Sequence, residues 1–539
     1  MTALHSPCLE RASEATPRVT CVRFVSFVRT MMDAVRLLTT DDLRRWRTCP
    51  RHFWLHRRQE EGAPPVEDDA SSDAHVVAGP AVQEAIRASY PGATVLPEPA
   101  TPQEWAEATQ HTAALLNEGL WNLPGQAILG ACLASDDGAL VRMDVLAAGA
   151  LGVRLFKVKL ATVGDETDVD EVALWAHVAA RCGLRVQSVG MLLVDTAFVY
   201  PGLGCYAGLF REVDLAPVLG SRDVPNWLIS MRACERGAEP ASDPGAHCTK
   251  TDSCAHVNHC GSLHTDRLPL RPDSLDVLGR ELATELRLKG YSTVHQVPVD
   301  WLPDARRRRA WRAIREGRPE IEPNARAAME ALPYPRIALR IHTIGFATPI
   351  WPGTRPYHTL PYLWAADIQS APADQGVQHR SFLADERGDP RRAFAESLID
   401  AMGTEGAILA YNAGFERNRI QELALHFEDL ATELEALLPR LIDLFLMARQ
   451  HYYHPAMCGS WSFKSVFGAL APELKLDQFE CPGVADAQSA FAESLQRQTT
   501  AQRRQLLRQA LLHQAQDETE ALRRMVSLFE HAGPVSPDT

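Results

Sequence analysis

The stretch that decides the fold carries three evenly spaced cysteines, and it reads His247-Cys248-Thr249-Lys250-Thr251-Asp252-Ser253-Cys254-Ala255-His256-Val257-Asn258-His259-Cys260. Three thiolates are one ligand short of a closed four-cysteine metal site. Cys49, about two hundred residues upstream, is the candidate for the fourth ligand. A metal held by Cys49, Cys248, Cys254 and Cys260 would tie the start of a domain to its end. We therefore expect a first domain over residues 36–265.

Length and composition set the outer limits of the interpretation. A chain of 539 residues is too long for one hydrophobic core, so two or three domains are expected. Its formal net charge of −13 predicts that any contact with DNA or RNA is local. The cysteines favour metal binding over disulfides, and hence a reducing, cytoplasmic location. No apolar run approaches the roughly 20 residues of a membrane helix, so no membrane partner is expected.

Hydrophobic periodicity in the first domain predicts an α/β core. The first helix is expected to begin at Thr39 or Thr40, with acids in its first turn, and to end at Cys49. Further helices are predicted over 51–55, 76–90, 102–120 and 170–182, and strands over 140–146, 153–160 and 189–194.

The remaining chain is predicted to contain a helical connector and a second α/β domain. The connector covers 266–332, and the second domain covers 333–532. Strands are expected at 337–343, 360–368 and 407–411, and helices from 415, over 440–450 and over 486–532. Residues 1–35 and 533–539 are interpreted as terminal tails.

The cysteine stretch allows three interpretations. Structural zinc prefers closer cysteine spacing, although His247, His256 or His259 would supply further ligands. A four-iron four-sulfur cluster accepts wider spacing and four thiolates, and this is the interpretation that we favour. Independent buried thiols are the third.

Several strings carry a resemblance to known families. The residues from Leu38 to Leu55, the two strands at 140–160 and the closing cysteines resemble the iron–sulfur branch of the RecB-type nucleases. From about 37 to 530 the chain resembles the bacterial family called domain of unknown function 2779, whose C-terminal half is similar to DEDD-type 3′–5′ exonucleases of the ribonuclease H-like fold. The strings are Trp351-Pro352-Gly353-Thr354-Arg355-Pro356-Tyr357, Asp389-Pro390-Arg391, Tyr411-Asn412-Ala413-Gly414-Phe415-Glu416, Tyr452-Tyr453-His454-Pro455 and Gly459-Ser460-Trp461-Ser462-Phe463-Lys464.

The RecB-type resemblance implies a metal site with an acid on one strand and Glu-x-Lys on the next. Asp144 matches the acid and Lys159 matches the lysine, but Lys157 occupies the glutamate position and Trp175 a position that is often Gln. An ammonium repels a dication by several kcal/mol at short range. We therefore expect Asp144 and Lys159 to form a structural salt bridge. The alternative is a metal site completed by an acid at Asp165, Glu166 or Glu171.

The DEDD-type resemblance implies two metal ions, Mg²⁺ or Mn²⁺, held by four acids. The strand that would read Asp-x-Glu reads Arg340-Ile341-His342. Glu416 follows the second motif, Asp443 is expected on the next helix, and Asp517 follows His513, which takes a tyrosine position. We expect Arg340 to pair with one of the three acids. The alternative is that all three gather around one cation.

Three functions follow from these observations. The favoured one is an iron–sulfur, nuclease-like protein of DNA or RNA metabolism that has lost hydrolysis and acts through binding or scaffolding. The others are an active metal-dependent 3′–5′ exonuclease, and a redox-sensing or structural metalloprotein with no nucleic-acid role. The predicted phosphate contacts, if the basic run is more than a solvated helix face, are Arg306, Arg307, Arg308, Arg309, Arg312, Arg315 and Lys464.

Overall fold

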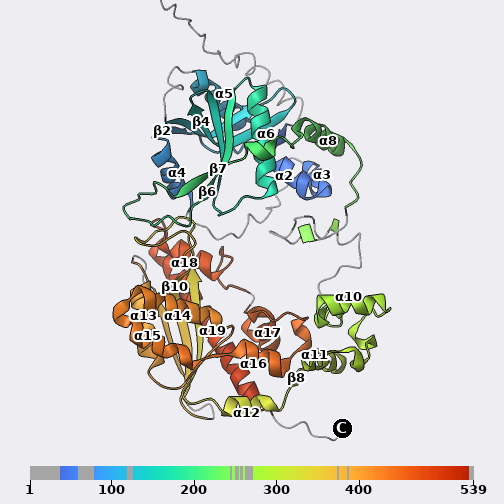
Figure 1. Ribbon diagram of the computed structural model, residues 1–539, viewed down its shortest axis with the longest axis vertical. Helices are drawn as coiled ribbons and strands as arrows, with labels where there is room; N and C mark the ends of the chain where they lie inside the picture. Colours follow the sequence, from blue (N-terminus) through green and yellow to red (C-terminus); the bar gives the residue numbers. More distant parts are fainter. Residues whose placement is uncertain are drawn as a thin grey trace, which may run out of the picture. The chain divides into compact units, whose positions relative to one another are not determined.

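The computed structural model of the chain describes residues 37–58, 78–117, 125–242, 246–248, 254, 256, 259–260, 271–372, 376–384, 388–476 and 478–532. The predicted tails lie outside these residues. The chain divides into two compact units (Figure 1). The first comprises Met1–Asp68, Gly79–Phe198 and Leu203–Val257, and the second comprises Asp69–Ala78, Val199–Gly202 and Asn258–Thr539.

A mixed sheet forms the centre of the first unit. Its strand order is β2-β3-β4-β5-β6-β7, with β1 paired to β4 beside β5. The strands are β1 (Leu38–Thr39), β2 (Gly92–Val95), β3 (Gln126–Ala134), β4 (Ala139–Gly149), β5 (Gly152–Lys159), β6 (Val186–Val194) and β7 (Phe210–Asp214). Neighbours β3, β4 and β5 are antiparallel, whereas β5 and β6 are parallel. The parallel step needs a crossover, and α6 (Glu166–Arg181) supplies it.

Helix α6 covers one face of this sheet because its apolar residues meet those of β3 to β6 (Figure 1). Val172 and Val178 are fully buried in that core, together with Met143 of β4. Helices α2 (Thr40–Thr48), α3 (Pro50–Arg57) and α8 (Val224–Arg236) extend the same layer. Helices α4 (Ala78–Ser89) and α5 (Pro102–Asn117) precede the long strands.

The second unit is a three-layer α/β arrangement. Its sheet has the order β11-β10-β9-β12-β13, in which β9, β12 and β13 are parallel. The strands are β9 (Arg336–Ile344), β10 (Leu360–Gln369), β11 (Gln378–Leu383), β12 (Ala407–Ala410) and β13 (Leu441–Asp443). Alternation along β9 sends Ile337, Leu339 and Ile341 to one face. Ala338, Arg340 and His342 face the opposite way.

Helices cover both faces of this second sheet. The face with Ile341 packs against α13 (Arg391–Met402), α14 (Gly414–His426) and α15 (Ala431–Leu437) (Figure 1). The opposite face packs against α16 (Leu444–His451), α18 (Ala487–Leu495) and the long α19 (Ala501–Glu530). The fold therefore places α19 directly over Arg340 and His342.

Residues 271–332 share a core with the second sheet and its helices. They form α10 (Arg280–Leu288), α11 (Ala305–Glu316), α12 (Asn324–Glu330) and short turns. Leu275, Leu286 and Met329 are fully buried in one cluster with Leu444 of α16 and Leu522 of α19. Strand β8 (Glu320–Ile321) pairs with β14 (Tyr452–Tyr453), which ties this segment to the rest of the unit.

Some predicted elements need correction, although the α/β class is confirmed. Residues 441–443 form strand β13 instead of the start of a helix, because Leu441 pairs in parallel with Ile408 of β12. Strand β3 was not predicted, since it is buried almost throughout and shows no alternation. Helix α6 begins at Glu166, four residues earlier than expected, behind a capping box of Asp165 and Asp168. No helix in the described part of the chain is long and apolar enough to cross a membrane.

Candidate functional sites

The first candidate site lies where β4 and β5 separate beneath α6. Pairing between the two strands ends at Val145 and Phe156, so the amide of Val158 has lost its partner across the ladder. The Asp144 carboxylate accepts that N–H at 2.7 Å. Burial raises the pKa of Asp144, although the nearby Lys157 ammonium and this hydrogen bond oppose the rise. Asp144 thus links the two strands at the point where their pairing has ended.

Two lysines of β5 point toward the first turns of α6, because residues two apart on a strand share a face. Lys157 forms an ion pair with Glu171, and its Nζ lies 3.7 Å from Oδ1 of Asp168. Lys159 contacts Asp168 at 2.5 Å and Asp165 at 2.9 Å. The expected Asp144–Lys159 salt bridge is therefore wrong. The capping geometry of α6 brings its own acids closer to Lys159.

The buried acids of α6 are neutralised from several sides. Glu171 is 2% exposed, and Arg44 of α2 binds its other oxygen at 2.7 Å. Asp170 is 3% exposed and lies 2.5 Å from Arg47 and 3.1 Å from Arg222. The Lys157 ammonium also lies 5.8 Å from the ring centre of the buried Trp175. Glu166 forms an ion pair with Arg222, so the three acids that were candidates for completing a metal site all contact bases of the same unit.

The second candidate site is built on β9 and α19. Arg340 Nε donates to Glu518 Oε2 at 2.7 Å, and His342 Nε2 lies 3.2 Å from the same oxygen. Gln514 donates to the other carboxylate oxygen at 3.0 Å. Burial raises the pKa of Glu518, but the charges of Arg340 and His342 outweigh it and the net shift is downward. Arg340 also lies 4.2 Å from the ring centre of Phe463.

Glu416 of α14 is the most unusual acid of this site. It is fully buried, and neither carboxylate oxygen has a hydrogen-bond partner in the described part of the chain. Burial raises its pKa to about 7, even though the charge of Arg340 lowers it. Asp443 and Glu518 add to the rise through their negative charges. Glu416 therefore carries its proton for much of the time near neutral pH.

The remaining predicted acids have separate local partners. Asp443 ends β13 and caps α16, where it accepts the N–H groups of Asn412 at 3.0 Å and Phe445 at 2.9 Å. It had been expected within a helix. Asp517 lies 3.1 Å from His513, and both line a hollow of about 280 Å³ beside residues 506–517 of α19. Burial raises the pKa of Asp517, while His513 opposes the shift.

Sequence reasoning missed Glu518, which is the partner of Arg340. Arg340 was expected to pair with Glu416, Asp443 or Asp517, and the acid that it contacts is one residue beyond the last of these. A signal for Glu518 exists. It continues the row of Leu511, Ala515 and Leu522, whose spacing of three or four residues marks the buried face of α19.

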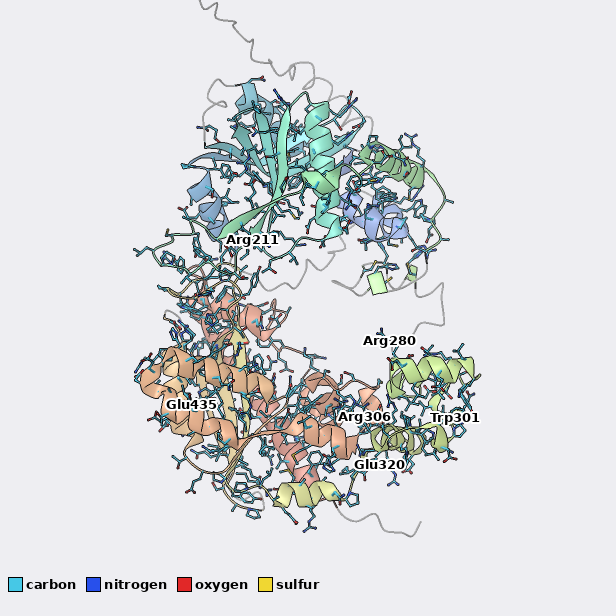
Figure 2. The ribbon with its side chains drawn as sticks, in the orientation of Figure 1. Arg211, Arg280, Trp301, Arg306, Glu320 and Glu435 are labelled. Atoms are coloured by element: carbon cyan, nitrogen blue, oxygen red, sulfur yellow. The ribbon has the colours of Figure 1, made fainter. Side chains whose placement is uncertain are left out.

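The arginine run forms α11, and most of its guanidinium groups have partners within the unit. Arg309 is 3% exposed and binds Glu322 at 3.0 Å and the carbonyl of Arg449 at 3.1 Å. Figure 2 marks Arg306 on α11 and Glu320 on the short strand after it. Arg312 binds Glu320 at 2.7 Å. The other contacts of the run are those of Arg307 with Asp304, Arg308 with the Leu302 carbonyl and Arg315 with the Trp311 ring. Lys464 is exposed on α17 (Phe463–Leu470).

The four predicted cysteine ligands fall in both units. Cys49, buried between α2 and α3, lies 3.4 Å from the Ser242 hydroxyl. The amide of Cys254 donates to the carbonyl of Cys248 at 3.1 Å, and Cys260 is buried at the start of the second unit. Residues 249–253, 255 and 257–258 lie outside the described residues. Burial and the neighbouring Cys49 raise the pKa of Cys234, a cysteine that the predicted set did not include.

Among the described residues, no group of three or more His, Cys, Asp or Glu side chains is placed to hold a metal ion. This holds for the acids of both candidate sites and for the described part of the cysteine stretch. The four-cysteine set stays a prediction from spacing.

Comparison with known proteins found one similarity. The family model "Domain of unknown function (DUF2779)" matches residues 338–462. A search of curated proteins and one of solved structures found no match. The matched residues run from β9 to the turn before α17 and contain Arg340, His342, Glu416 and Asp443, but not Glu518. Over that region the chain is similar to the DUF2779 family.

Proposed function

We propose that this protein is a nuclease-like protein that binds DNA or RNA without hydrolysing it. One observation carries the loss of hydrolysis: in each candidate site a basic side chain forms an ion pair with a buried acid. Lys157 lies between Glu171 and Asp168, and Arg340 binds Glu518. The nucleic-acid part rests on the resemblance of the sequence to nucleases.

In both sites a nearby base weakens the attraction of the carboxylates for a divalent cation. A divalent cation is bound by carboxylates whose charge is still available. A lysine or arginine within ion-pair distance already neutralises that charge, and it repels an incoming dication by several kcal/mol even at an effective dielectric constant of about 20. The acids remain, but their interaction with a metal ion is replaced by an interaction with the protein itself.

A cleavage assay tests the loss of hydrolysis. We expect the parent protein to leave end-labelled single- and double-stranded oligonucleotides intact with Mg²⁺ or Mn²⁺. We expect the pair Arg340→Asp and His342→Glu, or Lys157→Glu alone, to gain manganese-dependent cleavage, because each replaces the base with an acid. Arg392→Gln, which removes an exposed charge elsewhere, is the matched control.

The same assay decides the competing function. Cleavage by the parent that is abolished by Asp517→Ala would establish an active exonuclease and overturn our proposal. Loss of Asp517 alone removes no contact of Arg340, so a fall in activity would report on chemistry at α19 and not on the ion pair.

A binding assay tests the nucleic-acid part separately. We expect fluorescence anisotropy of labelled oligonucleotides to show binding that weakens steeply with salt, as counterion release requires. Lys464→Gln removes an exposed predicted contact, and we expect it to reduce the salt slope by about one unit. The absence of salt-dependent binding to single or double strands would leave only a role without nucleic acid.

A four-iron four-sulfur cluster on Cys49, Cys248, Cys254 and Cys260, with zinc as the alternative, is a further proposal from the spacing. Its support is chemical, since thiolates are the ligands of such clusters. The described geometry gives it no three-ligand group, and we assign the cluster no step.

A further inference from the structure

A second kind of site lies in the second unit, away from the Arg340–Glu518 pair. A pocket of about 230 Å³ opens between the start of β10, the first residue of α13 and one face of α14. Its charged and titratable lining residues are His358, Arg391, Arg419, Glu422 and His426. The three residues from α14 are spaced by three and four positions, so they form one row on that helix.

Two arginines supply the pocket with hydrogen-bond donors that are only partly used. Arg391 has a side chain that is 6% exposed, and its Nε lies 2.9 Å from each oxygen of Asp389. Arg419 binds Glu422 at 2.6 Å and the Thr359 carbonyl at 3.4 Å. The Nε of Arg419 is buried and has no hydrogen-bond partner in the described part of the chain. A planar guanidinium has five N–H donors, so each arginine retains capacity for an anion.

Two histidines, His358 and His426, also line the pocket. Burial and the charges of Arg391 and Arg419 lower the pKa of His358, and burial and Arg391 lower the pKa of His426. Asp389 opposes both shifts without cancelling them. The Nδ1 of His358 is buried and, like Arg419 Nε, has no hydrogen-bond partner among the described atoms. His358 and Arg419 both line the pocket, so an anion there would lie beside their side chains.

We propose that this pocket binds a phosphate group, with Arg391 and Arg419 as its cationic ligands and His358 and His426 as additional donors. Its volume of about 230 Å³ lies below that of a pocket for a drug-sized ligand, which suits a small anion. Guanidinium groups match the geometry of phosphate oxygens, and the anion would share Arg391 with Asp389 and Arg419 with Glu422. The proposal does not depend on a nucleic-acid role for the protein.

Calorimetric titration with inorganic phosphate tests the assignment. We expect saturable binding to the parent, and at least tenfold weaker binding to Arg419→Gln, because a charge-assisted pair is lost. Arg392→Gln is the matched control: it removes the same charge from the neighbour of Arg391, but Arg392 is half exposed and pairs with Asp429 outside the pocket. Equal affinity of Arg419→Gln and the parent, or no binding at roughly 10 mM phosphate, would overturn the proposal.

Glu422→Gln gives a test in which the expected result is tighter binding, which a misfolded variant would not show. This carboxylate competes for the Arg419 guanidinium at 2.6 Å, so its neutral replacement should tighten phosphate binding severalfold. Unchanged or weaker binding by a folded Glu422→Gln variant would count against the site.

Two further measurements identify the source of the phosphate and the role of the histidines: a comparison of ligands and the pH dependence of binding. Adenosine monophosphate that binds more tightly than inorganic phosphate, while adenosine does not bind, would assign the pocket to a phosphomonoester; equal affinities would assign it to the free ion. Sulfate stays dianionic across the range tested, so its affinity should rise as the pH falls from 7 to 5 and His358 and His426, whose pKa values are lowered, gain protons. A flat profile would contradict their part. Proton NMR should show both imidazoles titrating at higher pH with phosphate bound.

Discussion

A carboxyl group that is buried without partners makes folding sensitive to pH. The pKa of Glu416 rises from its ordinary value of 4.5 to about 7 because the folded protein removes it from water. Between these values the folded state holds a proton that the unfolded chain has released, so stability falls as the pH rises through this window. Below it both states are protonated and the burial of Glu416 has no ionic cost.

Replacement of Glu416 by Gln should remove this dependence. We expect the stability of the parent relative to Glu416→Gln to fall by roughly 2.5 kcal/mol between pH 5 and pH 8. Urea unfolding of both proteins at the two pH values measures it. The control is Glu435→Gln on the neighbouring α15, where the carboxylate is exposed (Figure 2) and the difference should not change with pH. A parallel pH profile for the parent and Glu416→Gln would contradict the assignment.

The residues of the second site show where a sequence pattern loses accuracy. The substitution of bases for acids at Arg340 and His342 is visible in the sequence, and so is the expectation that Arg340 meets an acid. Which acid it meets depends on the rotation of α19 over β9. Adjacent helix residues point about 100° apart, so a choice between Asp517 and Glu518 needs the buried row of the helix as well as the motif.

At the scale of single elements, the start of α2 depends on a reciprocal cap. The Thr39 hydroxyl accepts the amide of Asp42 at 3.2 Å, and the Asp42 carboxylate accepts the amide of Thr39 at 2.9 Å. Asp42 is buried and also lies 3.3 Å from Arg57 of α3. The cap therefore fixes the entry of α2 and its contact with α3.

We expect Thr39→Ala to weaken this cap by about 1 kcal/mol. Hydrogen exchange read by mass spectrometry should then speed up about fivefold for the amides of residues 40–48, because 1 kcal/mol changes a local opening equilibrium by that factor. Thr39→Ser keeps the hydroxyl and should exchange like the parent. If Thr39→Ser and Thr39→Ala exchange equally fast, the hydroxyl is not the cause.

The turn that leads into β12 requires glycine for two separable reasons. Gly403 and Gly406 both have positive φ, +54° and +88°, which an L side chain rarely adopts. A Cβ on Gly406 would also lie 2.1 Å from the carbonyl oxygen of Pro335, whereas one on Gly403 would meet nothing within 4 Å. The two positions share the backbone strain and differ in the clash.

Alanine at the two positions should separate strain from collision. We expect Gly403→Ala to cost roughly 1 to 3 kcal/mol of unfolding free energy from backbone strain alone, because φ +54° with ψ −161° is a conformation that is almost restricted to glycine. We expect Gly406→Ala to cost roughly 2 to 4 kcal/mol, since the backbone of Pro335 cannot move aside without disturbing β9. Chemical denaturation measures both. Equal losses would mean that the turn relaxes around the added methyl group.

Elements with strong local signals were predictable, and those that depend on a partner were not. The capping of α2, the alternation along β9 and the apolar row of helix α19 follow from residues that are close in sequence. Strand β13 has three residues, and only its pairing with β12 makes it a strand. The partner of Lys159 was also not predictable from nearby residues. Lys159 binds Asp168 because α6 begins earlier than its apolar pattern suggests.

For the whole molecule, metal binding by the evenly spaced cysteines can be measured directly. We expect anaerobically purified protein to be brown with about four irons per chain, and Cys254→Ala to lose both colour and iron. Absorption spectra and iron and zinc analysis measure this, with Cys205→Ala at an exposed cysteine as the control. One zinc per chain in a colourless protein would assign the cysteines to zinc, and neither metal would leave them as separate thiols.

The bases of the two acid clusters also change what the protein needs from its surroundings. A metal ion reaches its site from solution, so occupancy follows the free concentration and can be lost to a chelator. Lys157 and Arg340 are attached to the chain that carries their acids, and their effective concentration at Glu171 and Glu518 is set by the fold. The charge balance of these clusters is therefore inherited with the sequence and is independent of the supply of divalent metal in the cell.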